Sequence, residues 1–165
     1  MELPGALSTE NPSHAQTIYQ AIEASTQSPL EHVRKPAEQL LKACEEIPGY
    51  TSILASIAGT HAAAADSRAG AVILLKNMVR ARWKSRGGRG VVVGEGEKAA
   101  LRGFLLGAME EPEERVASQL AVLMGKVARV DWPRQWPELF PSLVGSLVSG
   151  GPSRRRMALC GTDEV

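Results

Sequence analysis

Apolar residues recur at spacings of three and four along most of the chain, a period that predicts amphipathic helices. A first helix is expected to start at residues 11–13, and a second at Ser28 and Pro29, where a capping residue precedes a proline at the first helical position. Pro36 falls inside the second stripe, so this helix is expected either to begin near Lys35 or to kink at the proline.

Five further stripes begin near residues 50, 62, 95, 113 and 135–137, each bounded by glycine, proline or polar residues. The stripe near residue 62 is expected to begin with a cap at Asp66 or Ser67. Its apolar face would carry Val72, Leu75, Val79 and Trp83. The pattern predicts seven helices and no strand.

After the first helix, the others group as three antiparallel pairs at about 31–59, 66–109 and 113–148. Their spacing of about 40–45 residues is typical of HEAT and armadillo repeats. We therefore predict an all-α fold, a HEAT/armadillo-type α-solenoid of about three helical hairpins (the ARM-type fold). A four-helix bundle is the alternative, but the repeating period favours a solenoid of stacked helical pairs.

Charge and cysteine content exclude several classes of protein. Nineteen basic residues against 18 acidic ones give a net charge of +1, which argues against a dedicated nucleic-acid binder. Cys44 and Cys160 have no metal-binding spacing and suit a reducing compartment. The N-terminus lacks the features of a secretory signal, and no apolar run could span a bilayer, so no membrane association is expected.

No catalytic, cofactor-binding or metal-binding residue is predicted, so we do not expect an enzyme. The segment 91–99 reads like a strand before a G-x-G-x-x-A turn, but no βαβ pattern surrounds it. The three histidines lie on separate segments without matching partners. The basic stretch at 80–90, which contains RGGRG, leaves RNA binding open as an alternative, although a solvated linker explains it as well.

Four blocks of sequence, in order, resemble one family. They are KPAEQLL at 35–41 with PGY at 48–50, then Arg68 with Leu75-Lys76-Asn77 and Trp83, then Glu97-Lys98 with Leu101-Arg102, and finally DWPRQWPEL at 131–139. Together they resemble the N-terminal domain of the importin-β (karyopherin) superfamily, and most of all its importin-11 branch. On this basis the chain divides into an N-terminal segment with a short helix (1–28), an importin-β N-terminal HEAT-repeat domain (29–148) and a flexible tail (149–165).

The resemblance implies a role in protein import into the nucleus. Receptors of this family bind the small GTPase Ran in its GTP form through their first repeats, mainly by the inner helix of each pair. Here the inner helices would start near residues 50, 95 and 135, and the contact candidates are Thr51, Ser52, Lys98, Arg102, Gln135 and Glu138. The family motifs assign structural roles to Lys76, Asn77, Trp83, Asp131, Pro133, Trp136 and Pro137.

The resemblance also implies nucleoporins as partners, no cofactor, and residence in the cytoplasm, the nucleus and the nuclear envelope. The sequence departs from the family in its loop at 84–94 and in its tail, which does not resemble a further repeat. A truncated chain is therefore expected, with cargo binding in doubt because later repeats usually hold cargo. A helical scaffold without GTPase binding, or a nonfunctional truncation, stays as the alternative.

Overall fold

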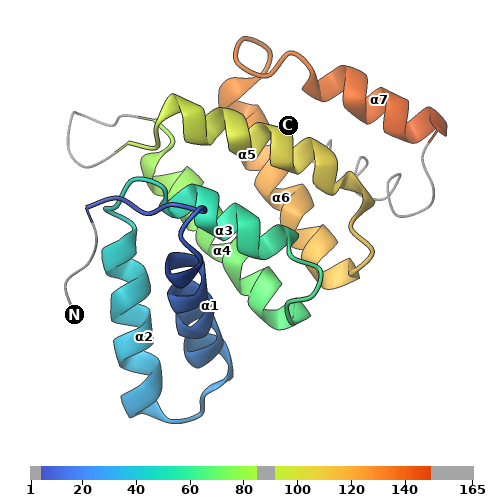
Figure 1. Ribbon diagram of the computed structural model, residues 1–165. Coiled ribbons are helices and arrows are strands. Elements are labelled where there is room, and N and C mark those ends of the chain that lie inside the picture. The colour runs from blue at the N-terminus through green and yellow to red at the C-terminus, as the bar shows by residue number, and fades with distance from the viewer. Residues whose placement is uncertain (1–4, 85–91, 150–165) are drawn as a thin grey trace.

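The computed structural model describes residues 5–84 and 92–149. Within these ranges the chain forms seven α-helices and no strand (Figure 1). They are α1 (Pro12–Gln27), α2 (Glu31–Cys44), α3 (Tyr50–Gly59), α4 (Ala65–Arg82), α5 (Glu95–Gly107), α6 (Glu114–Asp131) and α7 (Leu139–Ser149), with a short 3-10 turn, Ala108–Glu110, after α5. The all-α prediction is confirmed. Residues 85–91 of the basic loop and 150–165 of the tail lie outside the described residues.

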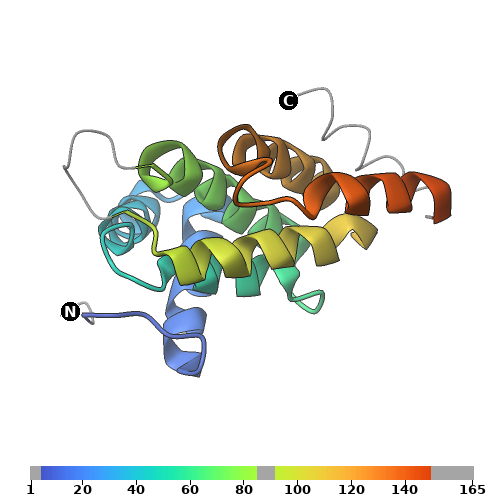
Figure 2. The same ribbon diagram turned by 90° about the horizontal axis from the view of Figure 1, so that it is seen from above.

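The helices pack as stacked pairs, but the pairs differ from those expected. α1 packs against α2, α3 against α4, and α5 against α6. Between pairs, α4 lies beside α6 and α3 beside α5, which gives two layers (Figure 2). The expected pairs at 31–59, 66–109 and 113–148 are therefore wrong by one helix. The expected pairs left out the first helix and started from the second. The buried Ile18 and Ile22 show that α1 belongs to the first pair, so every later pair shifts by one helix.

The predicted apolar faces of the central helices are confirmed. On α4 the stripe from Val72 to Trp83 is buried, and on α6 all four expected positions are buried, namely Val116, Leu120, Leu123 and Val127. On α5, Leu101 and Leu105 are buried, whereas Phe104 is only partly covered. The core therefore runs along the stack between the two layers, as in a repeat protein whose pairs bury their faces on one another.

The helix starts follow the sequence signals only in part. Asn11 caps α1 by accepting a hydrogen bond from the Ser13 amide at 3.1 Å. α2 begins at Glu31, continues through Pro36 and is preceded by Leu30, so neither Pro29 nor Lys35 marks its start. α4 begins at Ala65 without a side-chain cap, and the expected caps at Asp66 and Ser67 are wrong. Packing of the apolar face, more than capping, sets these boundaries.

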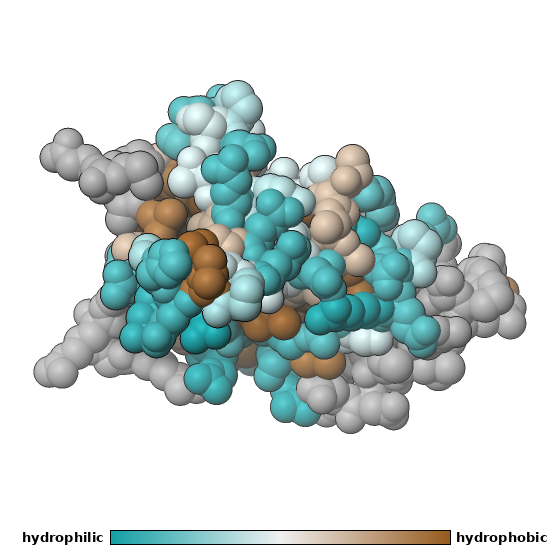
Figure 3. Space-filling view, turned by 90° about the horizontal axis from the view of Figure 1, so that it is seen from below, coloured by the Kyte–Doolittle hydropathy of each residue, from teal (hydrophilic) through white to brown (hydrophobic). Residues whose placement is uncertain are grey.

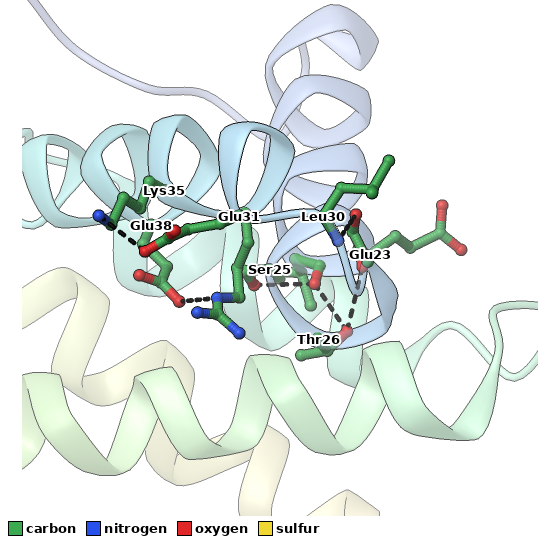
Figure 4. A network of polar contacts seen from close by, with 10 residues as sticks. Glu23, Ser25, Thr26, Leu30, Glu31, Lys35 and Glu38 are labelled. Carbon is green, nitrogen blue, oxygen red and sulfur yellow. Dashed lines mark hydrogen bonds and ion pairs between the residues drawn. The ribbon is translucent and has the colours of Figure 1, made fainter.

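Local polar contacts stabilise the turn between α1 and α2 (Figure 4). The hydroxyls of Ser25 and Thr26 donate to the Ile22 carbonyl at 2.9 and 2.7 Å, which satisfies a carbonyl near the end of α1. On α2, Glu31 and Lys35 form an ion pair at 2.8 Å with four-residue spacing. These contacts lie within the two helices, and in the turn between them the Leu30 amide donates to the Ser28 hydroxyl at 3.3 Å.

The connection after α6 is longer than expected, and α7 begins at Leu139 rather than at 135–137. Trp136 in this connection is buried, and Leu139 and Leu143 attach α7 to the core. The opposite face of α7 exposes Phe140, Val144 and Val148. α7 therefore packs on one side only, within the part of the chain that the structure describes.

Candidate functional site

A polar cluster joins α4, α5 and α6 where α4 and α6 end. The Trp83 indole N–H donates to Asp131 Oδ1 at 2.9 Å, and Arg102 Nη1 donates to Asp131 Oδ2 at 2.6 Å. Lys98 Nζ lies 5.7 Å from the centroid of the Trp83 ring, a cation–π geometry. Trp83 and Asp131 are both buried, so the structure brings two predicted motif residues together as a fixed junction.

Lys98 and Arg102, predicted as GTPase contacts, have their charged groups engaged inside the protein. Lys98 pairs with Glu95 at 2.7 Å, and this hydrogen bond is the main cause that lowers the pKa of the Glu95 carboxyl. Arg102 is held by the buried carboxylate of Asp131. Both side chains are largely covered. Their contacts within the junction explain why these two charged residues are present, without any contact to a GTPase.

The other four contact candidates do not form one surface. Thr51 is buried in the first turn of α3, and Ser52 beside it is half-buried. Gln135 and Glu138 are exposed in the connection between α6 and α7. These candidates were chosen on the assumption that α3, α5 and α7 were the second helices of their pairs. Because that pairing was wrong, a buried residue was placed on the expected contact face.

The remaining motif residues divide between packing and surface. Trp136 fills the core below the α6–α7 connection, while Pro133 and Pro137 lie exposed within that connection. Lys76 is half-buried on α4 and donates to the side-chain oxygen of Gln119 on α6. Burial, and then the charge of Lys126, lowers the pKa of the Lys76 ammonium group. Asn77 is exposed next to it.

A second clamp holds the opposite ends of α4 and α6. Arg68 Nε donates to the Ala58 carbonyl at the end of α3 at 2.9 Å, and its Nη2 pairs with the Glu111 carboxylate. Glu111 also accepts a hydrogen bond from the Glu113 amide at 3.0 Å. Both charged groups are buried, and each is paired and hydrogen-bonded as burial requires. The two clamps together fix how α4 sits against α6.

The outer surfaces of α4 and α6 form one continuous face. On α4 and just after it, the exposed positions Ile73, Asn77, Arg80 and Lys84 recur every three or four residues, away from the buried stripe. On α6 the corresponding positions are Gln119, Val122 and Lys126, which are half-buried, and Arg129, which is exposed. We call these eight residues the α4–α6 face. Ile73 keeps 45% of its surface exposed, which makes it an apolar position among polar ones.

A cleft of about 280 Å³ runs along this face between the last turns of the two helices. We call it the basic groove; it is lined by Val79, Arg80, Lys84, Lys126, Arg129 and Val130. Sequence reasoning grouped Arg80 and Lys84 with the loop that follows them and left Lys126 and Arg129 apart. The missed signal was that both pairs of cations lie opposite the apolar stripes of helices that stack on each other.

Other kinds of site receive no support from the described residues. No cluster of three or more potential metal ligands occurs among them. None of their helices has the length and hydropathy to cross a bilayer. Viewed from below, the surface is mainly hydrophilic with separate apolar spots rather than one broad apolar area (Figure 3).

Comparison with known sequences identifies the domain. Residues 37–111 match the family model of the importin-beta N-terminal domain. Over these residues, which make up a little less than half of the chain, it is similar to the N-terminal domain of the importin-β superfamily. The blocks at 35–41 and 131–139 flank or overlap this match in the order in which the resemblance was drawn.

The relatives agree with the expected branch. Importin-11 of Mus musculus and Importin-11 of Homo sapiens are each 39% identical over 103 residues, which is 62% of this chain and 10% of theirs. The importin beta-like protein KAP120 of Saccharomyces cerevisiae is 35% identical over 101 residues, 61% of this chain and 10% of its own. The chain thus spans about a tenth of the length of these curated relatives, and the importin-11-like character is confirmed.

The fold has a solved counterpart in the exportin Cse1 in its cargo-free, cytoplasmic state. The superposition has a TM-score of 0.76 at 16% identity and covers 91% of this chain and 16% of the exportin. At this identity the likeness concerns the fold alone. It confirms the predicted helical solenoid over nearly the whole chain.

Proposed function

We propose that the chain supplies the first repeats of a nuclear transport receptor and that these repeats bind the small GTPase Ran in its GTP form. The observation that carries the proposal is the match of residues 37–111 to the importin-beta N-terminal domain. The importin and exportin relatives support the same class of protein. Cargo binding is not proposed for these residues, because they correspond to about a tenth of each curated relative.

The corrected pairing moves the proposed contact surface. Family members bind Ran mainly by one helix of each pair, the inner one, which the sequence analysis took to be the second. In this chain the second helices are α2, α4 and α6 rather than α3, α5 and α7. We therefore place the main contacts on the α4–α6 face and keep Gln135 and Glu138 as secondary candidates, since they are exposed just beyond the end of α6.

The α4–α6 face has the composition of a protein-binding surface. Exposed Ile73 can serve as a small apolar anchor, and Asn77 and Gln119 supply hydrogen-bonding groups around it. Nearby cations would steer a partner and fix its register more than they would add affinity. The two clamps hold this face rigid, which reduces the ordering cost of association.

Binding to purified Ran loaded with GTP or with GDP tests the proposal. We expect at least about tenfold tighter binding to the GTP form, a difference of about 1.4 kcal/mol. The double variant Ile73→Asp/Asn77→Asp should reduce that affinity by a similar factor or more, because it places two carboxylates on the proposed contact. The control is Ser56→Asp at an exposed position of α3, which should leave binding unchanged.

Two results would defeat the proposal. Equal binding of both nucleotide forms, or none, would favour a helical scaffold without GTPase affinity. A loss caused by Ser56→Asp but not by the α4 variant would place the contact on the other layer. Residence in the cytoplasm and the nucleus, with nucleoporins as further partners, belongs to the same proposal and rests on the similarity to importins. No catalytic role is proposed.

A further inference from the structure

The basic groove brings cations from the end of α4 and from α6 into one cleft. Among the described residues, no acidic side chain pairs with Arg80, Lys84 or Lys126. The neighbouring cations are matched instead, since Arg82 donates to Glu46 at 3.1 Å and Arg102 to Asp131. The contrast matters because like charges held together in a cleft repel one another and destabilise the free protein.

Part of this charge has a structural explanation. Arg80 and Lys84 lie at the end of α4, and Arg129 lies in the last turn of α6, where cations interact favourably with helix dipoles. Lys126 does not fit that explanation as well, because it lies a turn earlier and faces the Lys76 ammonium group across the two helices. The repulsion between them contributes to the lowered pKa of Lys76.

We propose that the basic groove is an anion-binding cleft that receives acidic side chains from a protein partner docked on the α4–α6 face. Arg80 and Lys126 line the cleft from opposite helices and could hold one carboxylate between them by charge-assisted hydrogen bonds. Val79 and Val130 supply an apolar floor for the methylene groups of a glutamate. The inference rests on the proposed function in one respect, namely that Ran would be the partner that supplies the carboxylates.

The observations favour an acidic protein over a single-stranded nucleic acid. Recognition of single strands depends on aromatic side chains on which bases can stack. None of the six residues that line the groove is aromatic. Trp83, beside Lys84 in sequence, is only 2% exposed and donates its indole N–H to Asp131, and the exposed Trp132 lies against the Phe140 ring. A cleft of about 280 Å³ also suits a few side chains better than a run of nucleotides.

Binding of a fluorescein-labelled oligo-glutamate peptide to the whole chain tests the inference. The variant Arg80→Gln/Lys126→Gln should weaken peptide binding by about tenfold or more. The matched control is Arg34→Gln/Lys35→Gln, which removes the same charge from the exposed surface of α2 and should change binding little. The variant Arg80→Lys/Lys126→Arg, which keeps the charge, should retain most of the binding and guards against loss through misfolding.

Four outcomes would overturn the inference. The peptide could fail to bind the unmodified chain at low ionic strength, or both charge-removing variants could weaken binding equally, which would indicate diffuse attraction. Oligo(U) RNA could bind more tightly than the peptide and be lost in the groove variant, which would assign the groove to nucleic acid. Inorganic phosphate is the last competitor. If it displaced the peptide at low concentration, the groove would be a pocket for a single free anion, which would contradict a cleft for acidic side chains of a protein.

A parallel titration with GTP-loaded Ran separates this inference from the proposed function. Peptide binding that depends on the groove, together with absent Ran binding, would retain the cleft and defeat the GTPase proposal. Ran binding that the groove variant leaves unchanged would retain the GTPase proposal and remove the cleft from it.

Discussion

The α4–α6 junction and α7 are built from similar apolar patterns but are fixed to very different degrees. At the junction, buried apolar stripes are held at both ends by polar clamps, one at Glu111 and one at Asp131. α7 contributes Leu139 and Leu143 to the core and exposes Phe140, Val144 and Val148 on its other side. The difference shows that a helical stripe becomes core only where another helix covers it.

This contrast predicts different local stabilities within one chain. In stacked repeats each pair is stabilised mainly by its neighbours, so a helix covered on one side opens most easily. Substitutions at the junction should therefore lower the free energy of unfolding of the whole chain. Substitutions on the outer face of α7 should leave it almost unchanged.

The largest effect is expected for Glu111→Ala. It would leave the Arg68 guanidinium buried without its carboxylate, which costs about 3–5 kcal/mol. The double variant Arg68→Met/Glu111→Leu should recover much of the loss, because it leaves no buried charge unpaired. Urea denaturation measures both. A loss for Glu111→Ala below about 1 kcal/mol would mean that the pair does not hold the junction.

A smaller loss is expected for Leu75→Ala on α4. Leu75 is fully buried between the layers, and its truncation would cost about 2–5 kcal/mol, as other buried leucines do. The matched comparison is Leu143→Ala on α7, which should cost less because its surroundings can relax. Equal losses in urea denaturation would remove the proposed difference between the junction and α7.

Asp131→Asn should cost about 1.5–3 kcal/mol, the range for hydrogen bonds to charged groups. The amide oxygen can still accept from Trp83, but the charge that pairs with Arg102 is lost. Chemical denaturation gives the magnitude, and the NMR signal of the Trp83 indole N–H reports the change at the indole. If neither changed, the polar cluster at Asp131 would contribute nothing to the stability of the fold.

The smallest effect is expected for Val144→Ser/Val148→Ser on α7. Both side chains are more than half exposed, so their replacement should change stability by no more than about 0.5 kcal/mol. It should also reduce self-association at high concentration, because it removes an exposed apolar stripe. Sedimentation measures the association. A large drop in stability would show that this face is covered.

The helices and their buried faces could be predicted because both depend on residues three or four apart. The stripes on α4 and α6 were predicted correctly for this reason. Boundaries were less accurate where packing outweighed a local signal, as at Leu30 before α2 and Ala64 before α4. Periodicity predicts which face of a helix is buried, but it does not predict which other helix packs against that face.

The pairing of the helices was beyond the local pattern, and the site depended on it. Because each helix has neighbours before and after it in sequence, a shift by one gives an equally regular series of hairpins. That shift placed Thr51 on the contact face and left Arg80 and Lys126 in separate groups. The contact between Trp83 and Asp131 joins residues far apart in sequence, so only their membership in family motifs marked them beforehand.

The central claim is that the α4–α6 face receives GTP-loaded Ran. A map of amide chemical-shift changes by NMR, recorded on the chain with and without the GTPase, tests it most directly. We predict changes concentrated around Ile73, Asn77 and Arg80 on α4 and around Lys126 on α6, with GTP and not with GDP. Changes confined to the exposed residues of α3 and α5, or the same changes with both nucleotides, would contradict the account.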